Sequence, residues 1–458
     1  MRRKDVNMLS GSIVKGLLAF SVPIMVMNVM QSLFNIIDMT ILKTCDAGNG
    51  SAVGAVGVCS TLIGLITGLV IGISTGANVT IAKHIGRQDR KQVEQAVGTS
   101  VAVSVVSGIL IGVIGITFAK TFLRWTNCPE ELLSDAVLYF RLYFAGVPLL
   151  MIYNFAAAIL RSAGNSRQPM VFLTVGGAVK VLLTFLLVAV FRMGVRGVAI
   201  ATVVSWAISA GMGLLALVRT DSIIKLRFRS IWFYKGELAS ILRIGVPSGL
   251  QRGLYSVANV IIAATVNSFG AAATTGISIA NNYDNILYNI CTAASLAVMP
   301  YVSQNIGAGN VKRAMSSVWK GIAITVCFGG FFGALSALFS RELSSIMSSD
   351  PTVIDYSRQK MIIISSTYFI CGINEIFGAA LRGMGKPMAA TVATLIFMCA
   401  FRFLWVYMIF PLLPNLTFLY LVWPIGWILS IVTLLFVFFP TAKKLSRIAD
   451  NPLSLRNS

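Results

Sequence analysis

Long apolar runs alternate with short polar connections along the 458 residues of the chain. Each run is about 20 residues or longer, which is the length that an α-helix needs to cross a bilayer. The runs lack the alternation of polar and apolar residues that strands show, so we expect an all-α membrane protein. The twelve predicted spans are 16–42, 51–81, 95–119, 136–160, 170–191, 197–218, 244–267, 272–302, 315–340, 355–381, 388–410 and 416–440.

The two halves of the chain resemble each other. Pro23 recurs as Pro247, 224 positions later, and an asparagine follows each proline by twelve residues, at Asn35 and Asn259. Two further strings recur at an offset of 221, namely Ile85-Gly86 as Ile306-Gly307 and LRSAGNSRQPM (160–170) as LRGMGKPM (381–388). The sequence therefore predicts two six-helix repeats. Because each contains an even number of spans, a pseudo-two-fold axis along the membrane normal should relate them.

A polar and strongly basic stretch separates the two repeats. We expect an N-terminal six-helix lobe (1–218), a basic cytoplasmic linker (219–243), a C-terminal six-helix lobe (244–440) and a cytoplasmic tail (441–458).

Composition and charge agree with a multi-pass membrane protein. The chain is 56% hydrophobic and only 12% charged, with a mean hydropathy of +0.82. Its 37 Lys and Arg outnumber 16 Asp and Glu, giving a net charge of +21. Most of the bases lie in the N-terminus, the even-numbered connections and the tail, which predicts cytoplasmic termini. A basic face beside anionic membrane lipid explains this charge better than a nucleic-acid partner.

The cysteines and the histidine give little sign of a metal site. Seven cysteines form no CxxC pair and lie mostly in apolar runs, where they pack as small apolar residues. His84, the single histidine, has no ligand pattern around it in the sequence. We therefore expect no metal and no cofactor other than a coupling ion.

Polar residues inside the first-half spans mark a cavity. Asn28, Gln31, Asn35 and Asp38 share one helical face, which must point at protein or water because it would be costly in lipid. Lys180 lies at mid-membrane depth and needs a counter-charge, and Asp38 is the only acid within the spans of this half. We expect the two to interact, either as a structural ion pair or as a working one. Further candidates in this half are Asn154, Thr184 and Thr202.

The second half repeats the plan with other residues. Its seventh span carries Ser248, Arg252, Tyr255 and Asn259 on one face, and its eighth carries Asn281, Asp284, Asn285 and Tyr288. Glu375 and Arg402 complete the set. Three acids, Asp38, Asp284 and Glu375, then balance three bases, Lys180, Arg252 and Arg402. That balance fits a fully paired interior and equally a proton relay.

These features together resemble the multidrug and toxic compound extrusion (MATE) family along nearly the whole chain. The matching residues are Pro23 with Asp38 fifteen residues later, Leu160–Gly164, Gly194–Thr202, Gln304–Gly309 (QNIGAG), Leu381–Lys386 (LRGMGK) and Trp423-Pro424. The resemblance implies a V-shaped pair of six-helix lobes in a bacterial cell membrane. Such a protein, acting as a monomer, exports organic cations against H⁺ or Na⁺ by alternating access.

Asp38 is similar to the first-helix carboxylate of a bacterial branch of the family, in which this residue takes part in coupling, and Asn154 and Thr202 match the polar network of that branch. The fifth helix departs from the pattern, because Lys180 and Thr184 stand where the branch often has Asn and Asp. We expect Asp38, Lys180, Asp284 and Glu375 to serve ion coupling, and the other polar residues named above to line the substrate cavity.

Two other classes of function are alternatives to a cation exporter. Lys180 and Arg252 suit a flippase or exporter of an anionic or lipid-linked metabolite, because Lys and Arg bind phosphate. An intramembrane enzyme or a channel is disfavoured, since the sequence shows no nucleophile and base pair, no HExxH motif and no filter-like repeat. The absence of a nucleotide-binding loop also argues against ATP as the direct energy source.

Overall fold

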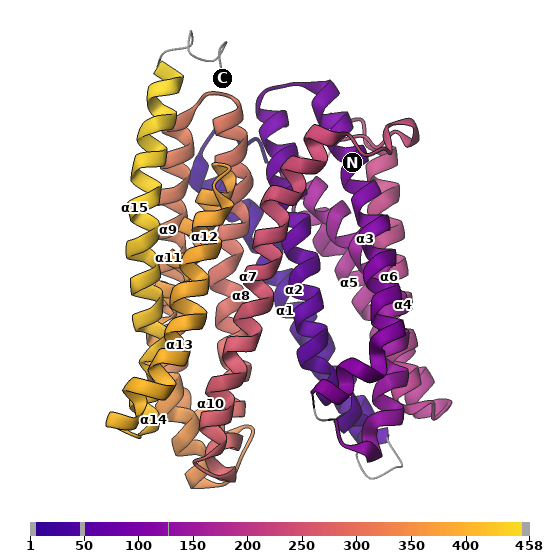
Figure 1. The fold of residues 1–458 in the computed structure, drawn as a ribbon, viewed down its shortest axis with the longest axis vertical. Helices are drawn as coiled ribbons and strands as arrows, with labels where there is room; N and C mark the ends of the chain where they lie inside the picture. The colour runs from indigo at the N-terminus through magenta and orange to yellow at the C-terminus, as the bar shows by residue number, and fades with distance from the viewer. Residues whose placement is uncertain (1–5, 46–50, 127, 451–458) are drawn as a thin grey trace. The chain divides into compact units, whose positions relative to one another are not determined.

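The computed structural model describes residues 6–45, 51–126 and 128–450 as helices and short connections (Figure 1). The first half contains α1 (Ile13–Cys45), α2 (Ser51–Gly86), α3 (Arg90–Trp125), α4 (Glu130–Ser162), α5 (Arg167–Thr184) with the π-helical turn η1 (Phe185–Val190), and α6 (Gly194–Arg219). The connection carries the 3₁₀ turn η2 (Phe228–Ser230). The second half contains α7 (Lys235–Asn267), α8 (Ala271–Gly307), α9 (Val311–Leu338), α10 (Ser340–Ser345), α11 (Pro351–Gly383), α12 (Pro387–Thr394), η3 (Leu395–Ala400), α13 (Phe401–Leu404), η4 (Trp405–Ile409), η5 (Phe410–Leu412), α14 (Leu416–Tyr420) and α15 (Val422–Asp450).

The predicted all-helical membrane architecture is confirmed. Within the described part of the chain, eleven helical segments are long and apolar enough to cross a membrane. The remaining predicted span, the seventh, is α7, a helix of 33 residues that also carries Glu237, Arg243 and Arg252. It begins at Lys235, well before the predicted residue 244, so the connection between the repeats is shorter than the predicted linker 219–243.

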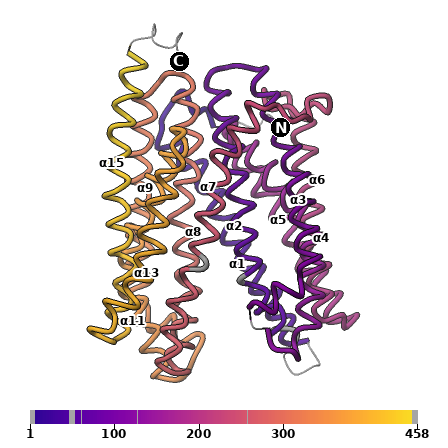
Figure 2. Tube along the Cα trace, viewed as in Figure 1, coloured from indigo at the N-terminus to yellow at the C-terminus, as the bar shows by residue number. Residues whose placement is uncertain are grey.

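The chain forms two compact units that do not follow the predicted halves at every point. One unit contains Val26–Gly249, and the other contains Val6–Met25 and the chain from Leu250 onward. The first part of α1 thus belongs to the C-terminal unit, and the first part of α7 to the N-terminal unit. In both helices the change of unit comes just after the internal proline, Pro23 or Pro247. Figure 2 traces the helices as they run up and down within each unit.

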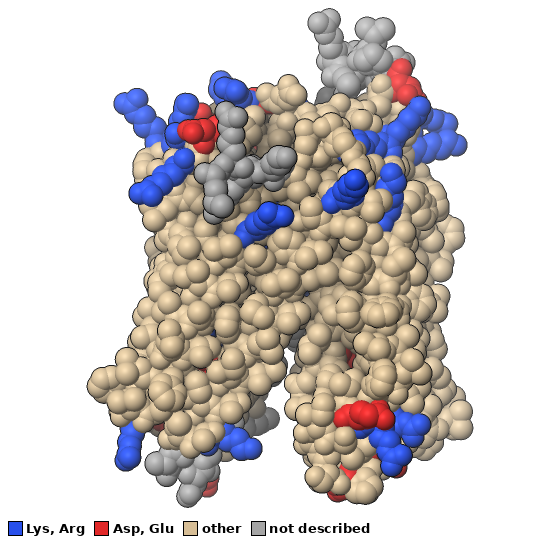
Figure 3. Space-filling view, turned by 180° about the vertical axis from the view of Figure 1, so that it is seen from behind, with Lys and Arg blue, Asp and Glu red and all other residues tan. Residues whose placement is uncertain are grey.

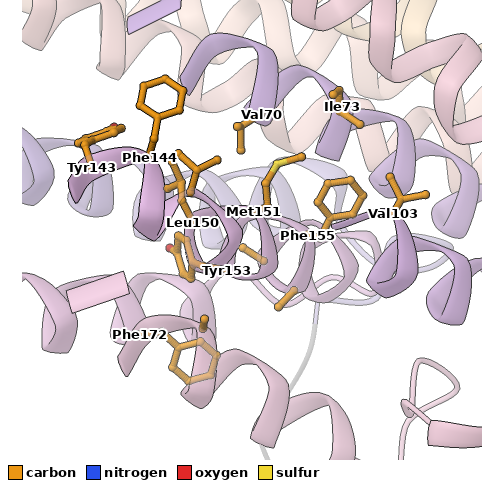
Figure 4. Close-up of a cluster of buried hydrophobic side chains, with 14 of the residues drawn as sticks. Val70, Ile73, Val103, Tyr143, Phe144, Leu150, Met151, Tyr153, Phe155 and Phe172 are labelled. Carbon is orange, nitrogen blue, oxygen red and sulfur yellow. The ribbon is translucent and has the colours of Figure 1, made fainter. Parts of the chain in front are cut away.

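α4 forms the centre of the N-terminal unit. Its Phe144, Met151 and Phe155 are almost fully buried and lie on the same side of α4 as Val70 of α2, whereas Tyr153 lies on the other side, toward Phe172 of α5 (Figure 4). Lipid chains are as apolar as these side chains, so close packing between helices, more than the hydrophobic effect, stabilises such a core.

Glycines let α2 and the first part of α7 approach each other closely within the N-terminal unit. A Cβ atom on Gly72 would lie 2.1 Å from Cα of Gly249, and one on Gly76 would lie 2.1 Å from the carbonyl oxygen of Ile241. Gly245 meets the backbone of Ile73 in the same way. Small residues at helix interfaces in membranes permit this backbone contact.

We therefore expect Gly72→Ala to push α2 and α7 apart and to lower the melting temperature of the purified protein. Gly64→Ala is the matched control, because Gly64 lies on the same helix and a Cβ atom there meets nothing within 4 Å. Melting in detergent, followed by tryptophan fluorescence, measures both variants beside the wild type. Equal melting temperatures for the two variants would contradict the close contact.

The QNIGAG string (Gln304–Gly309) lies at the end of α8 and holds the segment before α1 in the C-terminal unit. Nδ2 of Asn305 donates to the carbonyl oxygen of Met8 at 3.0 Å, and Met8 is 1% exposed. Arg313 of α9 donates to Met8 and Ser10 as well. This part of the motif therefore has a structural role.

Charged side chains gather near the ends of the helices, as Figure 3 shows for one face of the molecule. The band between the ends is covered mainly by uncharged residues. Such a band suits the hydrocarbon core of a bilayer, where charges are costly.

Candidate functional site

A buried ion pair joins α1 and α5 in the N-terminal unit. Nζ of Lys180 lies 2.5 Å from Oδ2 of Asp38 and 3.4 Å from Oδ1 of Asn35. Asp38 is 3% exposed, whereas Lys180 is only partly buried and Asn35 is exposed. The predicted contact between Asp38 and Lys180 is confirmed. One side of the pair is thus closed by protein and the other borders an accessible surface.

The carboxylate of Asp38 has unused bonding capacity. No hydrogen-bond donor among the described residues satisfies its Oδ1 atom, and Oγ1 of the fully buried Thr184, one turn after Lys180, also lacks a partner. A carboxylate with a single cationic neighbour and a free oxygen can accept a proton or contribute to binding a cation. Protonation would remove the charge that holds Lys180.

Other predicted first-half residues bond elsewhere. Nδ2 of Asn154 donates to the carbonyl oxygen of Leu150 at 2.9 Å, and Oγ1 of Thr202 donates to that of Val198 at 2.8 Å, so each bonds within its own helix. Neither donates to Asp38. On α1, Asn28 is partly buried and Gln31 is exposed. The structure therefore joins Asp38, Asn35 and Lys180, and gives Asn154 and Thr202 no direct part in that cluster.

A second buried ion pair lies in the C-terminal unit, between α8 and α11. Nζ of Lys360 is 2.9 Å from Oδ2 of Asp284 and also donates to Oδ1 of Asn281. Lys360 is 3% exposed and Asp284 is 7% exposed. Lys360 is not among the predicted site residues, although it falls within the predicted span 355–381. It lies near the edge of that span, where a lysine usually reaches out to the headgroup region.

A third acid pairs with a residue outside the predicted spans. Oε2 of Glu375 lies 3.8 Å from Nη2 of Arg382, which is only 8% exposed. Nη1 of Arg382 donates to Oε1 of Gln251 at 3.2 Å, and Gln251 donates to Thr394. Among the described residues, Lys360 and Arg382 are thus ion-pair partners of Asp284 and Glu375, and neither base was among the three that the sequence analysis balanced against the acids.

Arg402 on α13 is the most buried base of the C-terminal unit, at 1% exposed. Its Nη1 donates to Oδ1 of Asn259 at 2.5 Å. The guanidinium lies over two rings, 4.7 Å from the centroid of Tyr255 and 5.4 Å from that of Trp423. The predicted residues Tyr255, Asn259 and Arg402 thus come together, and Trp423 joins them. Asn285 is exposed on α8, whereas Tyr288 is partly buried.

His84 has a partner that the sequence did not reveal. Its Nε2 lies 3.0 Å from Oε2 of Glu237, and both residues are less than 9% exposed. The helix α2 continues to Gly86 and α3 begins at Arg90, with Asp89 capping its first turn, so most of the charged residues between the predicted spans 51–81 and 95–119 are helical. His84 therefore ties the end of α2 to the start of α7 within the N-terminal unit.

Two repeats of long apolar helices with buried charged groups are common among membrane transporters. The MatE family model matches residues 23–186 and again 247–408, so the chain belongs to the MatE family, a family of transporters and not of enzymes. One match lies within each of the two repeats that the sequence predicted.

Individual relatives are similar over much of the chain. It is 27% identical over 401 residues to the "Probable multidrug resistance protein YpnP" of Bacillus subtilis, covering 87% of this chain and 89% of that protein. It is 26% identical over 269 residues to the "FAD transporter" of Shewanella oneidensis, covering 58% of this chain and 59% of that protein. A solved MATE family transporter in an outward-facing conformation superposes with a TM-score of 0.88 over 98% of this chain and 100% of that one, at 20% identity. The structural likeness confirms the predicted fold.

Proposed function

We propose that the protein is an antiporter that exports organic compounds and is driven by the inward movement of H⁺ or Na⁺. We place it in a bacterial cell membrane with both termini in the cytoplasm, as its basic even-numbered connections indicate. The observation that carries the proposal is the ion pair between Asp38 and Lys180, a carboxylate buried in a membrane helix beside an accessible surface. Ionisable residues inside membrane spans commonly mark ion pathways.

The coupling step would act on the ion pair. A proton or Na⁺ that arrives at Asp38 neutralises its carboxylate and weakens its attraction for Lys180. Helices α1 and α5 are then held less tightly to each other. Helix α1 begins in the C-terminal unit and continues in the N-terminal unit. Neutralising the carboxylate of Asp38 therefore acts on a helix that belongs to both units. This gives the coupling ion a route to an alternating-access change.

The substrate is first expected to be an organic cation, in line with the family resemblance and with the multidrug resistance relative. An anionic metabolite is the second candidate. It is supported by the bases Lys180, Lys360 and Arg402 in the two units and by the relative that carries the name of an FAD transporter. The charge of the substrate therefore has to be tested directly.

An efflux assay tests the proposal. Bacteria that lack their own exporters are loaded with ethidium, a fluorescent organic cation, and export is followed while the H⁺ and Na⁺ gradients are collapsed separately. We expect wild-type protein to export ethidium and to stop when one of the two gradients is lost. Protein that is present in the membrane and exports nothing under either gradient would contradict a cation antiporter and favour the anionic substrate.

A further inference from the structure

The fifth helix of each repeat brings a base to the same asparagine of its first helix. Lys180 contacts Asn35, and Arg402 contacts Asn259, and each asparagine follows the repeat's proline by twelve residues. Aligning Pro169 with Pro387 places Arg402 at the position of Thr184, one helical turn after Lys180. Both helices also contain a π-helical turn next to this point, η1 in the first repeat and η4 in the second. Such turns are frequent at functional sites.

The two repeats differ in what neutralises the base. In the first, Asp38 supplies a carboxylate three residues after Asn35. The equivalent position in the second, three residues after Asn259, is Ile262, which is 3% exposed. In the described part of the C-terminal unit the acids Asp284 and Glu375 form ion pairs with other bases, and neither forms one with Arg402. The second repeat therefore keeps the base and lacks the acid.

Arg402 is consequently a buried cation with bonding capacity to spare. Its Nη2 atom has no hydrogen-bond partner among the described residues. The attraction of a cation for an aromatic ring is smaller than the cost of burying a charge. The two rings thus offset only part of that cost. An anion bound to the guanidinium would offset the remaining cost of burying the charge, because a planar guanidinium binds carboxylate and phosphate in a bidentate manner.

The surroundings of Arg402 indicate what kind of anion would bind. Asn259 is exposed, so the side of the guanidinium that it contacts borders an accessible surface. Tyr255 and Trp423 are only partly buried and offer ring faces beside the charge. Planar aromatic compounds stack on such faces. An aromatic compound with a carboxylate or phosphate group matches both features.

We propose that Arg402, Asn259, Tyr255 and Trp423 form a subsite in the C-terminal unit for the carboxylate or phosphate group of a transported aromatic compound. The bound anionic group neutralises the charge of Arg402, as the carboxylate of Asp38 neutralises the charge of Lys180. This subsite rests on the proposed function as a transporter and deepens it, because it assigns the anionic part of the substrate to one unit and the coupling ion to the other.

Binding to the purified full-length protein, held in phosphatidylcholine nanodiscs that carry no net anionic headgroups, tests the subsite. The probes are fluorescein, an aromatic carboxylate, and flavin mononucleotide, an aromatic phosphate, with ethidium as the cation. We expect Arg402→Gln to weaken binding of both anions about tenfold or more, the loss expected for a charged hydrogen bond, whereas ethidium binding should not weaken, because the variant removes a positive charge that repels a cation. Arg402→Lys should keep part of the affinity.

Ile262 provides a second and independent test. Ile262→Asp places a carboxylate three residues after Asn259, the position that Asp38 has in the first repeat. It should then compete with both anionic probes for Arg402, again about tenfold, as expected for a charged partner. Ile262→Asn is the matched control, because it has the same shape without the charge and should bind the probes more tightly than Ile262→Asp. Melting temperatures follow folding, and Ile262→Asp should melt no lower than Ile262→Asn if it pairs with Arg402.

The outcomes separate the subsite from the wider proposal. Wild-type affinity for both anions in Arg402→Gln, or equal affinities in the two Ile262 variants, would overturn the subsite. Gradient-driven ethidium export by Arg402→Gln is measured in the same cells as the wild type. If that export continues while anion binding is unaffected by the variant, the transporter proposal stands and the subsite falls.

Discussion

Asp38→Asn is expected to abolish gradient-driven export while the protein still folds and reaches the membrane. The amide has nearly the same shape as the carboxylate and fits the same space, but it neither takes up a proton nor attracts Lys180 as a charge. The coupling ion then has no site at which its arrival changes the contact between α1 and α5. Ethidium export from efflux-deficient bacteria, with the amount of protein in the membrane measured on the same cells, shows the effect.

Two variants make this result specific. Asp38→Glu keeps a carboxylate on the same helix and should retain part of the export. Asp221→Asn removes an acid from the connection between the repeats, where the side chain of Asp221 is fully exposed, and should export at the wild-type rate. Export by Asp38→Asn at the wild-type rate would remove the coupling role, and loss of export in Asp221→Asn would show that the assay responds to charge in general.

The number and the order of the helices could be predicted from the sequence because each span is a continuous apolar run of sufficient length. The start of α7 could not. Its first turns contain Glu237 and Arg243, which a hydropathy pattern assigns to a polar linker. In the structure this part of α7 lies against α2 through glycine contacts and through the pair of His84 with Glu237, so other protein covers one face of it. A pattern along one helix does not show which neighbours cover it.

The charged site was predictable only where the choice of partners was small. The first half has a single acid within its predicted spans, and Lys180 is the base at mid-membrane depth, so the pairing of Asp38 with Lys180 followed directly. In the second half the predicted spans contain several acids and several bases, and the distances that decide between them depend on how the helices pack. Lys360 and Arg382, the ion-pair partners of Asp284 and Glu375, therefore could not be singled out from the sequence.

Lys360→Met is expected to destabilise the protein strongly, because it leaves the carboxylate of Asp284 buried without its cation. Breaking a buried ion pair in this way costs about 3–5 kcal/mol, which is a large part of the stability of an ordinary domain. The melting temperature in detergent should fall clearly, and the yield of folded protein should fall with it. Lys225→Met is the control, since it breaks the exposed pair of Lys225 with Asp221 and should leave the melting temperature unchanged.

Combining Lys360→Met with Asp284→Asn distinguishes a lost contact from an uncompensated charge. If the cost arises from the unpaired carboxylate, removing its charge should restore most of the melting temperature, even though the ion pair is still absent. A double variant that melts as low as Lys360→Met would instead assign the loss to packing around Trp423, whose ring centroid lies 5.8 Å from Nζ of Lys360. If the double variant regains the melting temperature but does not export, the pair of Lys360 with Asp284 serves transport. A pair with a purely structural role could be replaced without loss of stability and without loss of export.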